Sequence, residues 1–175
     1  MRKFLIISNT VDVSKPLSLN SLTAYGRLDV ICRCISSAFY LSDDFRKDVV
    51  LSIFFQKNKK IIEIDGNKVR GLNPDERAIA GVLKKVFTGK FFPGINIQSK
   101  ELDMILQDES ILLLDKNGIK LDSTISESNI FIIGDHLGFQ IENEVLFKKF
   151  RKISLGKTEY MSSQVITILH FLMDS

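Results

Sequence analysis

The sequence lacks the motifs that mark most nucleotide-dependent and hydrolytic enzymes. It contains no P-loop, no glycine-rich dinucleotide fingerprint, no nucleophile elbow and no zinc-binding spacing. Histidine occurs only at His136 and His170, and a lone histidine in a polar loop is more often a hydrogen-bonding group than a general base. Cys32 and Cys34 lie two apart on a predicted helix and point to different faces, so we expect no disulfide between them and see little support for a metal site.

Long apolar runs are also missing. No stretch approaches the ~20 apolar residues that cross a bilayer. The run that begins at Met1 starts like a signal peptide, but it is too short and ends at the polar residues from Ser8 onward. The sequence has no internal repeat or linker, and 175 residues are within the usual size of one domain. We therefore expect a cytoplasmic protein with no membrane partner, folded as a single domain over residues 1–175.

What the sequence does contain is an ordinary globular composition with a small positive charge. Hydrophobic residues make up 45% of the chain, the net charge is +3 and the pI is about 8.8. These values are compatible with RNA binding, but many enzymes that act on neutral substrates have similar ones. Composition therefore leaves the function open.

Hydrophobic periodicity predicts an α/β fold. From Ser110 onward strands and helices alternate, which favours a parallel sheet with helices on its faces. One helix start is especially clear, with Asn73 as the cap and Pro74 as the first helical residue. The predicted strands cover residues 3–7, 49–55, 61–65, 94–97, 111–114, 130–133 and 153–155. The predicted helices cover residues 26–41, the stretch from Asn73 to Val86, a stretch capped by Ser99 that runs through Leu106, about 141–150 and about 160–173.

Three of the predicted strands end in loops that contain glycine. The strand Ile111–Leu114 is followed by the loop 115–118, the strand 130–133 by Gly134–Gly138, and the strand 153–155 by Gly156. Ligands of α/β sheets bind beyond the carboxyl ends of strands, where glycine lets the backbone approach them. If the three strands are neighbours, the loops form one pocket; the alternative is that they are ordinary turns between strands and helices.

The first predicted helix carries a face of mixed charge. Asp29 and Arg33 are spaced i,i+4, which is typical of a solvated ion pair that contributes a few tenths of a kcal/mol, roughly. The functional interpretation is a polar face that meets a substrate, although the spacing alone favours the solvated pair. The acid at Asp75 has a similar plain interpretation, because acidic residues in a first helical turn stabilise the helix dipole.

The last predicted helix is apolar over much of its circumference. Only a narrow stripe, at Ser163, Thr167 and His170, is polar. A helix with so much apolar surface needs more than one packing partner. We expect a subunit interface, and the alternative is deep burial within the monomer.

Seven segments of the chain, taken together, are specific. They are Ser8-Asn9-Thr10, Gly26–Cys34, Arg46–Val50, Asn73–Arg77, Ile133–Gly138, Ile153–Gly156 and Ile166–His170. In this order, and over nearly the whole chain, they resemble the tRNA pseudouridine N1-methyltransferases, the TrmY family of the SPOUT superfamily.

The resemblance implies an α/β fold of the SPOUT type, in which helices flank a mostly parallel sheet. It also implies a homodimer and a deep trefoil knot at the C-terminal end, about residues 110–175. The implied cofactor is S-adenosylmethionine, held by three knot loops that match the three glycine-bearing loops. The cofactor positions carried over are Leu114 in the first loop, Gly134 in the second, and Leu155, Gly156 and Val165 in the third.

The family's reaction is methyl transfer to N1 of pseudouridine at position 54, in the T-loop of tRNA. That nitrogen is a weak nucleophile while protonated, so the enzyme must orient it, help to remove its proton and take the base out of its stack. On this resemblance Arg27, Asp29 and Arg33 are the candidate catalytic residues, with Asp29 orienting the base or accepting its proton. Asp75 and Arg77 are second candidates. The expected partner is tRNA or another structured RNA, not DNA.

The chain departs from the family pattern in its third loop. Val165 stands where we expect the family's cysteine, and residues 157–164 lack the histidines of the archaeal form. These changes leave room for cofactor binding through backbone groups. The substrate, however, can differ from the archaeal one, as it would in a bacterial branch of the family. The alternatives are therefore a ribosomal RNA pseudouridine methyltransferase and a non-catalytic RNA-binding or scaffold protein.

Overall fold

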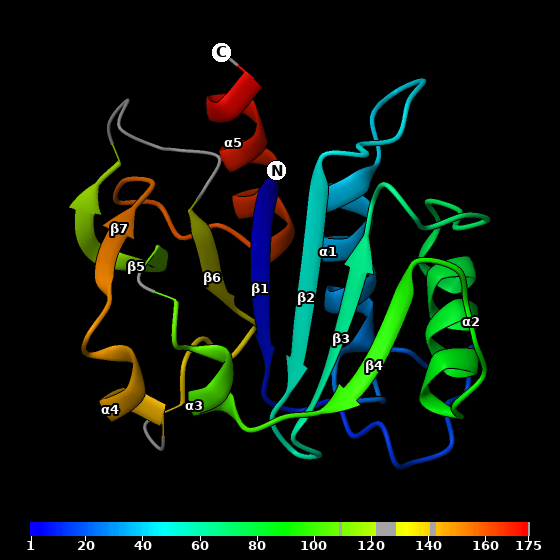
Figure 1. Ribbon diagram of the computed structural model, residues 1–175. Helices are drawn as coiled ribbons and strands as arrows, with labels where there is room; N and C mark the ends of the chain where they lie inside the picture. Colours follow the sequence, from blue (N-terminus) through cyan, green and yellow to red (C-terminus); the bar gives the residue numbers. More distant parts are fainter. Residues whose placement is uncertain (109, 122–128, 141–142, 175) are drawn as a thin grey trace.

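A seven-stranded sheet organises the chain in the computed structural model, which describes residues 1–108, 110–121, 129–140 and 143–174 (Figure 1). The strands are β1 (Arg2–Ser8), β2 (Val49–Phe55), β3 (Lys60–Asp65), β4 (Ile95–Ser99), β5 (Ile111–Lys120), β6 (Ile130–Gly134) and β7 (Arg151–Ser154). Their order is β4-β3-β2-β1-β6-β5-β7. Only the pairings β2–β3 and β3–β4 are antiparallel among the described strands, so the predicted mostly parallel sheet is confirmed.

Helices cover both faces of the sheet. They are α1 (Leu28–Phe39), α2 (Glu76–Phe87), α3 (Leu102–Ile105), α4 (Glu144–Phe147) and α5 (Ser162–Asp174). Side chains alternate between the two faces of β1. Phe4 and Ile6 therefore join the core beneath α1, α2 and α5, while Leu5 and Ile7 pack with α3 and α4 (Figure 1). Within the described part of the chain, no helix has the length and apolar character needed to cross a membrane.

The three strands that were predicted to end in glycine-bearing loops are neighbours. They lie in the order β6-β5-β7, and all run parallel. One detail of the prediction is wrong: the strand does not end at Leu114. Leu114 and Ile119 both pair with Ile153, so residues 115–118 bulge out and the strand then continues to Lys120. The predicted first loop is therefore a wide bulge within β5, because the chain rejoins β7 after it.

Two predicted helix starts are also wrong. Asp75, not Asn73, caps α2: its carboxylate accepts a hydrogen bond from the backbone N–H of Ala78 at 2.8 Å, and Pro74 lies before the cap. Ser99 is the last residue of β4, and Glu101 takes the cap position of α3. Asp is as good a cap as Asn or Ser, so a sequence that offers several caps in a row leaves the start ambiguous by two residues.

The C-terminal helices differ from their predictions in extent and in orientation. The helix predicted for about 141–150 is a single turn, α4, and its predicted start at Ile141 lies outside the described residues. On α5, only Thr167 of the predicted polar stripe is exposed. Ser163 and His170 are buried, whereas Phe171 and Leu172 are exposed.

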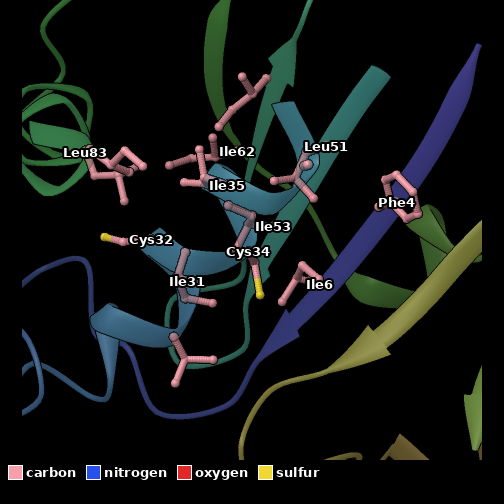
Figure 2. Close-up of a cluster of buried hydrophobic side chains, with 14 of the residues drawn as sticks. Phe4, Ile6, Ile31, Cys32, Cys34, Ile35, Leu51, Ile53, Ile62 and Leu83 are labelled. Carbon is pink, nitrogen blue, oxygen red and sulfur yellow. The ribbon is translucent and has the colours of Figure 1, made fainter. Parts of the chain in front are cut away.

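The two cysteines are free and buried on different sides of α1, as predicted. Figure 2 shows Cys32 pointing toward Leu83 of α2 and Cys34 pointing toward Ile6 of β1. Burial raises the pKa of each thiol to about 12. Thiols in such surroundings act as small core side chains and are not reactive.

Candidate active site

A cavity of about 1030 Å³ opens where β6, β5 and β7 present their loops. Its wall combines all three glycine-bearing segments with the beginnings of α1 and α5. All five residues predicted to hold the cofactor line it: Leu114, Gly134, Leu155, Gly156 and Val165. One pocket built from the ends of β6 and β7 and the bulge of β5 between them is therefore present.

The second loop is fixed by the buried carboxylate of Asp135. One carboxylate oxygen accepts the backbone N–H of Asn9 at 2.6 Å. The other accepts the Asn9 side-chain amide at 2.8 Å and the backbone N–H of Leu137 at 2.9 Å. The Asn9 amide also donates to the carbonyl of Gly138 at 2.9 Å. These bonds join the end of β6 to the end of its neighbour β1 and order the loop that borders the cavity.

Gly134 is required by the shape of this loop. A Cβ atom there would lie 2.7 Å from the backbone of Gly138, because the loop folds back over the end of β6. Its carbonyl accepts a hydrogen bond from the Ser162 hydroxyl at 2.6 Å, which ties the first turn of α5 to the same point. The close neighbour that demands glycine is thus the protein's own backbone.

Ion pairs connect the first and third segments at the cavity. Lys116, in the β5 bulge, pairs with Glu159 in the loop before α5. Lys152 of β7 donates to Asp115 at 2.8 Å, and this hydrogen bond holds the pKa of Asp115 below its usual value. Gly156 follows β7 with a φ of 119°, a backbone conformation that residues other than glycine rarely adopt.

At the start of α1, Asp29 holds two arginines beside the cavity. Arg27 donates to both carboxylate oxygens at 3.0 Å, and Arg33 donates to one of them at 2.8 Å. Asp29 is only 4% exposed, so this is not the solvated pair that the spacing favoured. Burial alone would raise the pKa of Asp29, but the hydrogen bonds from Arg27 and Arg33 outweigh it and hold the pKa below its usual value.

Arg27 has an unusual backbone conformation. It precedes α1 with φ 61° and ψ 43°, in the left-handed region that residues with a Cβ rarely occupy. Its side chain, together with that of Arg33, lines the cavity. The bidentate pair with Asp29 fixes the guanidinium. Such strain persists where the surrounding contacts hold it, and it is common at functional sites.

The second candidates, Asp75 and Arg77, are not brought to the cavity. Asp75 is the exposed cap of α2, and Arg77 is an exposed residue of its first turn. The residue between them, Glu76, does connect to the site, because it accepts a hydrogen bond from Arg33 at 3.1 Å. Asp75 thus has the plain structural role that the sequence favoured.

Sequence reasoning did not assign roles to Asn9, Asp135 or Ser162, although all three shape the second loop. Each makes its contacts with residues distant in sequence, such as the Asn9–Asp135 bond, so no local pattern marks them. The only signal was that Asn9 and Asp135 lie within segments that resemble the family.

Comparisons with known proteins show the family of the chain. Residues 1–175 match the model of a family described as "Putative SAM-dependent RNA methyltransferase". The tRNA (pseudouridine(54)-N(1))-methyltransferase of Methanocaldococcus jannaschii is 32% identical, over 99% of this chain and 97% of its own length. The enzyme of the same name from Methanosarcina acetivorans is 34% identical, over 99% of this chain and 91% of its own.

The fold also matches a solved structure. Nep1 of Archaeoglobus fulgidus, solved bound to S-adenosylhomocysteine, superposes with a TM-score of 0.76, and the match covers 99% of this chain and 97% of that one. Only 14% of the residues are identical, so this likeness shows the fold and no more. It places the chain among α/β proteins with this arrangement of strands and helices.

Proposed function

We propose, because the chain belongs to the family of SAM-dependent RNA methyltransferases, that it methylates N1 of pseudouridine at position 54 in tRNA. Its curated relatives carry this activity in their names and match it over almost its full length. The single observation that carries the proposal is the cavity. It joins three glycine-bearing strand ends, suited to a nucleoside cofactor, with two fixed arginines suited to RNA.

The residues of the cavity fit S-adenosylmethionine. Leu114, Leu155 and Val165 provide apolar walls for an adenine ring, Gly156 leaves the end of β7 without a side chain, and Gly134 allows the second loop to fold back beside the cavity. The bound cofactor supplies an electrophilic methyl group. The five residues predicted to hold it thus remain our proposed cofactor contacts.

The arginines of α1 are suited to holding the RNA. Arg27 and Arg33 can bind phosphate or the carbonyl edge of a flipped base. Asp29 fixes them, and its oxygens already accept three N–H bonds while its pKa is lowered. It is therefore a weak proton acceptor, and we assign it a positioning role instead of the basic one considered first. Tight orientation of two reactants can account for a large part of an enzymatic rate.

We further propose that the whole chain acts as one knotted SPOUT domain, with the knot at about residues 110–175. Two features support this arrangement. β6 lies between β1 and β5, although β5 precedes β6 in the chain. After β7, at the far side of β5, the chain returns so that α5 packs against α1. An RNA-modifying enzyme of this kind would work in the cytoplasm.

The exposed apolar side chains of α5 support a homodimer. Phe171 is 69% exposed and Leu172 is 42% exposed near the end of the helix, and Met161, just before its start, is 57% exposed. A stable dimer should bury more than about 1,000 Å² in total. Leu172→Glu should give a folded monomer by light scattering. Leu169 is fully buried, so a charge at Leu169 should unfold the chain instead. A monomer mass for the unmodified protein at micromolar concentration would refute the dimer.

Two experiments test the proposed activity. Isothermal titration should show binding of S-adenosylmethionine, and no binding to folded protein would refute the enzyme. Tritium labelling of total RNA with the labelled cofactor should place the label in the tRNA fraction. Label in ribosomal RNA would favour the ribosomal alternative, and cofactor binding without any methyl transfer would favour a scaffold protein.

A further inference from the structure

The reaction proposed above needs a proton acceptor, and the carboxylates that line the cavity are already committed. Asp115 pairs with Lys152 at 2.8 Å, and Glu159 pairs with Lys116. The third, Glu144 of α4, lies 3.5 Å from Lys148. The fourth, Asp135, accepts hydrogen bonds from Asn9 and from the backbone N–H of Leu137. The first three lie beside a lysine and the fourth is held by N–H donors, so all four carboxylates already have partners.

The arginines of α1 leave no acceptor on their side of the cavity. Arg27 and Arg33 are donors only, and the oxygens of Asp29 are occupied by them. Cys32 and Cys34 are buried in the core with pKa values raised to about 12 by burial. Thiols with such a pKa, pointing into the core, cannot serve.

His136 is placed differently. It lies at the first position of the turn after β6, and its ring lines the cavity. Its side chain is about a quarter exposed, and its Nδ1 atom lies 3.9 Å from the buried carboxylate of Asp135. Across the described residues, no hydrogen bond from another side chain holds the imidazole. Nδ1 is the ring nitrogen beside Asp135, so Nε2 is the nitrogen left for a bound base.

We propose that His136 is the group that accepts the N1 proton of the target pseudouridine; this rests on the proposed function. Neutral imidazole is the side chain whose charge changes near neutral pH, which suits a general base. The neighbouring carboxylate of Asp135 can stabilise the positive charge that the ring acquires. Asp135 is itself fixed by Asn9, so the ring sits beside a charge that does not move.

The step balances without a further reactant. The N1–H bond of pseudouridine breaks, its proton moves to Nε2 of His136, and its electron pair remains on N1. That pair forms the bond to the methyl group, while the pair of the broken S–CH₃ bond stays on the cofactor's sulfur. The imidazolium then returns its proton to water through the open side of the cavity.

The test compares the two histidines of the chain. Single-turnover methyl transfer to a tRNA transcript with pseudouridine at position 54 is measured between pH 5 and 9, roughly, a range that includes the ordinary pKa of histidine. The unmodified protein should lose rate on the acidic side, as imidazole becomes protonated. At higher pH the rate of the unmodified protein should become independent of pH. His136→Asn should lower the rate roughly 10²–10⁴-fold and remove this pH-independent region, so that the rate increases with hydroxide concentration over the whole range. His170→Gln, at the opposite end of β1, should keep the acidic limb.

A second readout separates a base from a structural residue. Isothermal titration of S-adenosylmethionine should give the same affinity for His136→Asn as for the unmodified protein. An unchanged rate and pH profile in His136→Asn would overturn the proposal. So would a lowered rate that keeps the acidic limb while cofactor affinity falls, because that pattern means a role in shaping the loop. No transfer by the unmodified protein would instead overturn the proposed function, and the role of His136 with it.

Discussion

Two clusters of arginine and aspartate lie at opposite ends of β1, and they differ in what they border. At the carboxyl end, Asp29 holds Arg27 and Arg33, whose side chains are 43% and 34% exposed. These guanidinium groups line the cavity. A buried carboxylate fixes the position of these guanidinium groups, and they remain accessible to a ligand.

The arginines of the cluster at the amino end of β1 are buried. Arg2 lies 2.7 Å from Asp174, and Arg46 also pairs with Asp174. The two arginine side chains are only 6% and 12% exposed. Asp174 is the last residue of α5, where the helix dipole disfavours an acid, and the two arginines offset this. His170 joins the cluster by accepting from Arg2 at 3.2 Å and donating to the carbonyl of Ala38 at 3.0 Å.

The comparison shows that ion-pair chemistry alone does not mark a functional site. Both clusters contain two arginines around one aspartate, and in each the pKa of the aspartate is held below its usual value. What separates them is where the arginines point. One pair faces a cavity at strand ends, and the other anchors α5 to β1. Substitutions in the first should change the reaction, and substitutions in the second should change stability.

Among substitutions that test this comparison, the largest effect is expected for Asp29→Asn. The amide retains the size of the carboxylate but cannot hold two guanidinium groups, so Arg27 and Arg33 should lose their fixed orientation. Methyl transfer should fall on the order of 10²-fold, the cost of a small misplacement, while affinity for S-adenosylmethionine stays the same. Single-turnover kinetics and isothermal titration measure the two quantities.

Asp174→Asn is the matched control at the other end of β1. It should lower the midpoint of thermal unfolding and leave the rate of the folded protein unchanged. If both variants lower stability and neither lowers the rate, the two clusters are equivalent and the contrast drawn between them is wrong.

Gly134→Val should have the next largest effect. Any Cβ there meets the backbone of Gly138 at 2.7 Å, so the second loop, which lines the cavity, must shift. Forcing atoms into a packed site costs about 1–3 kcal/mol, which corresponds to roughly tenfold weaker cofactor binding or more. Gly81→Ala in α2 is the control, because its Cβ would meet nothing closer than 4.0 Å. Equal cofactor affinities for both variants would show that the loop does not shape the cofactor site.

A smaller effect, on stability, is expected from His170. Burial is the main reason that its pKa is lowered from 6.5 to about 4. Because the folded state binds the proton less well than the unfolded state, the stability from neutral His170 is complete above pH 6.5 and is lost as the pH falls toward 4. Urea unfolding between pH 7.5 and 4.5, roughly, should show this loss, on the order of 2 kcal/mol. His170→Gln should flatten the dependence, and an equal slope in both proteins would contradict the assignment.

The smallest effect is expected for Val165→Cys. Val165 lies in the first turns of α5, where its backbone N–H donates to the carbonyl of Met161 at 2.9 Å. The substitution leaves this backbone in place, so cofactor affinity should change by less than about twofold. Single-turnover transfer to tRNA with pseudouridine at position 54 measures whether the missing cysteine matters. A large gain in rate would indicate that the natural substrate of this chain is a different RNA.

Much of the fold was predictable because strand periodicity and glycine loops are local signals. The strands β6 and β7 and the glycine-bearing loops after them follow from that pattern, whereas the adjacency of β6, β5 and β7, on which the cavity depends, was left open by the sequence. The return of the chain to β7 after the bulge at Asp115 could not be predicted, since it depends on pairing with Ile153. The sequence also did not show which face of α5 is buried. His170 looks polar in the sequence, but Arg2 and Ala38 satisfy its ring, and Phe171 takes the exposed position.

The site was predictable only in part, because its contacts join residues that are distant in the sequence. The resemblance located Arg27, Asp29 and Arg33, yet the bidentate geometry that supports the positioning role proposed for Asp29 is visible only in three dimensions. Asp135 and Asn9 are 126 residues apart in the chain, so no spacing rule connects them. Asp75 and Arg77 were candidates because they lie in a family-like segment, and the structure leaves them on the outer end of α2.

The most direct test of the account uses two tRNA transcripts that differ only at position 54, one with pseudouridine and one with uridine. Each is incubated with the protein and methyl-labelled S-adenosylmethionine, then digested to nucleosides and analysed by mass spectrometry. The account predicts N1-methylpseudouridine from the first transcript and no labelled nucleoside from the second. No label in either transcript, or equal label in both, would contradict it.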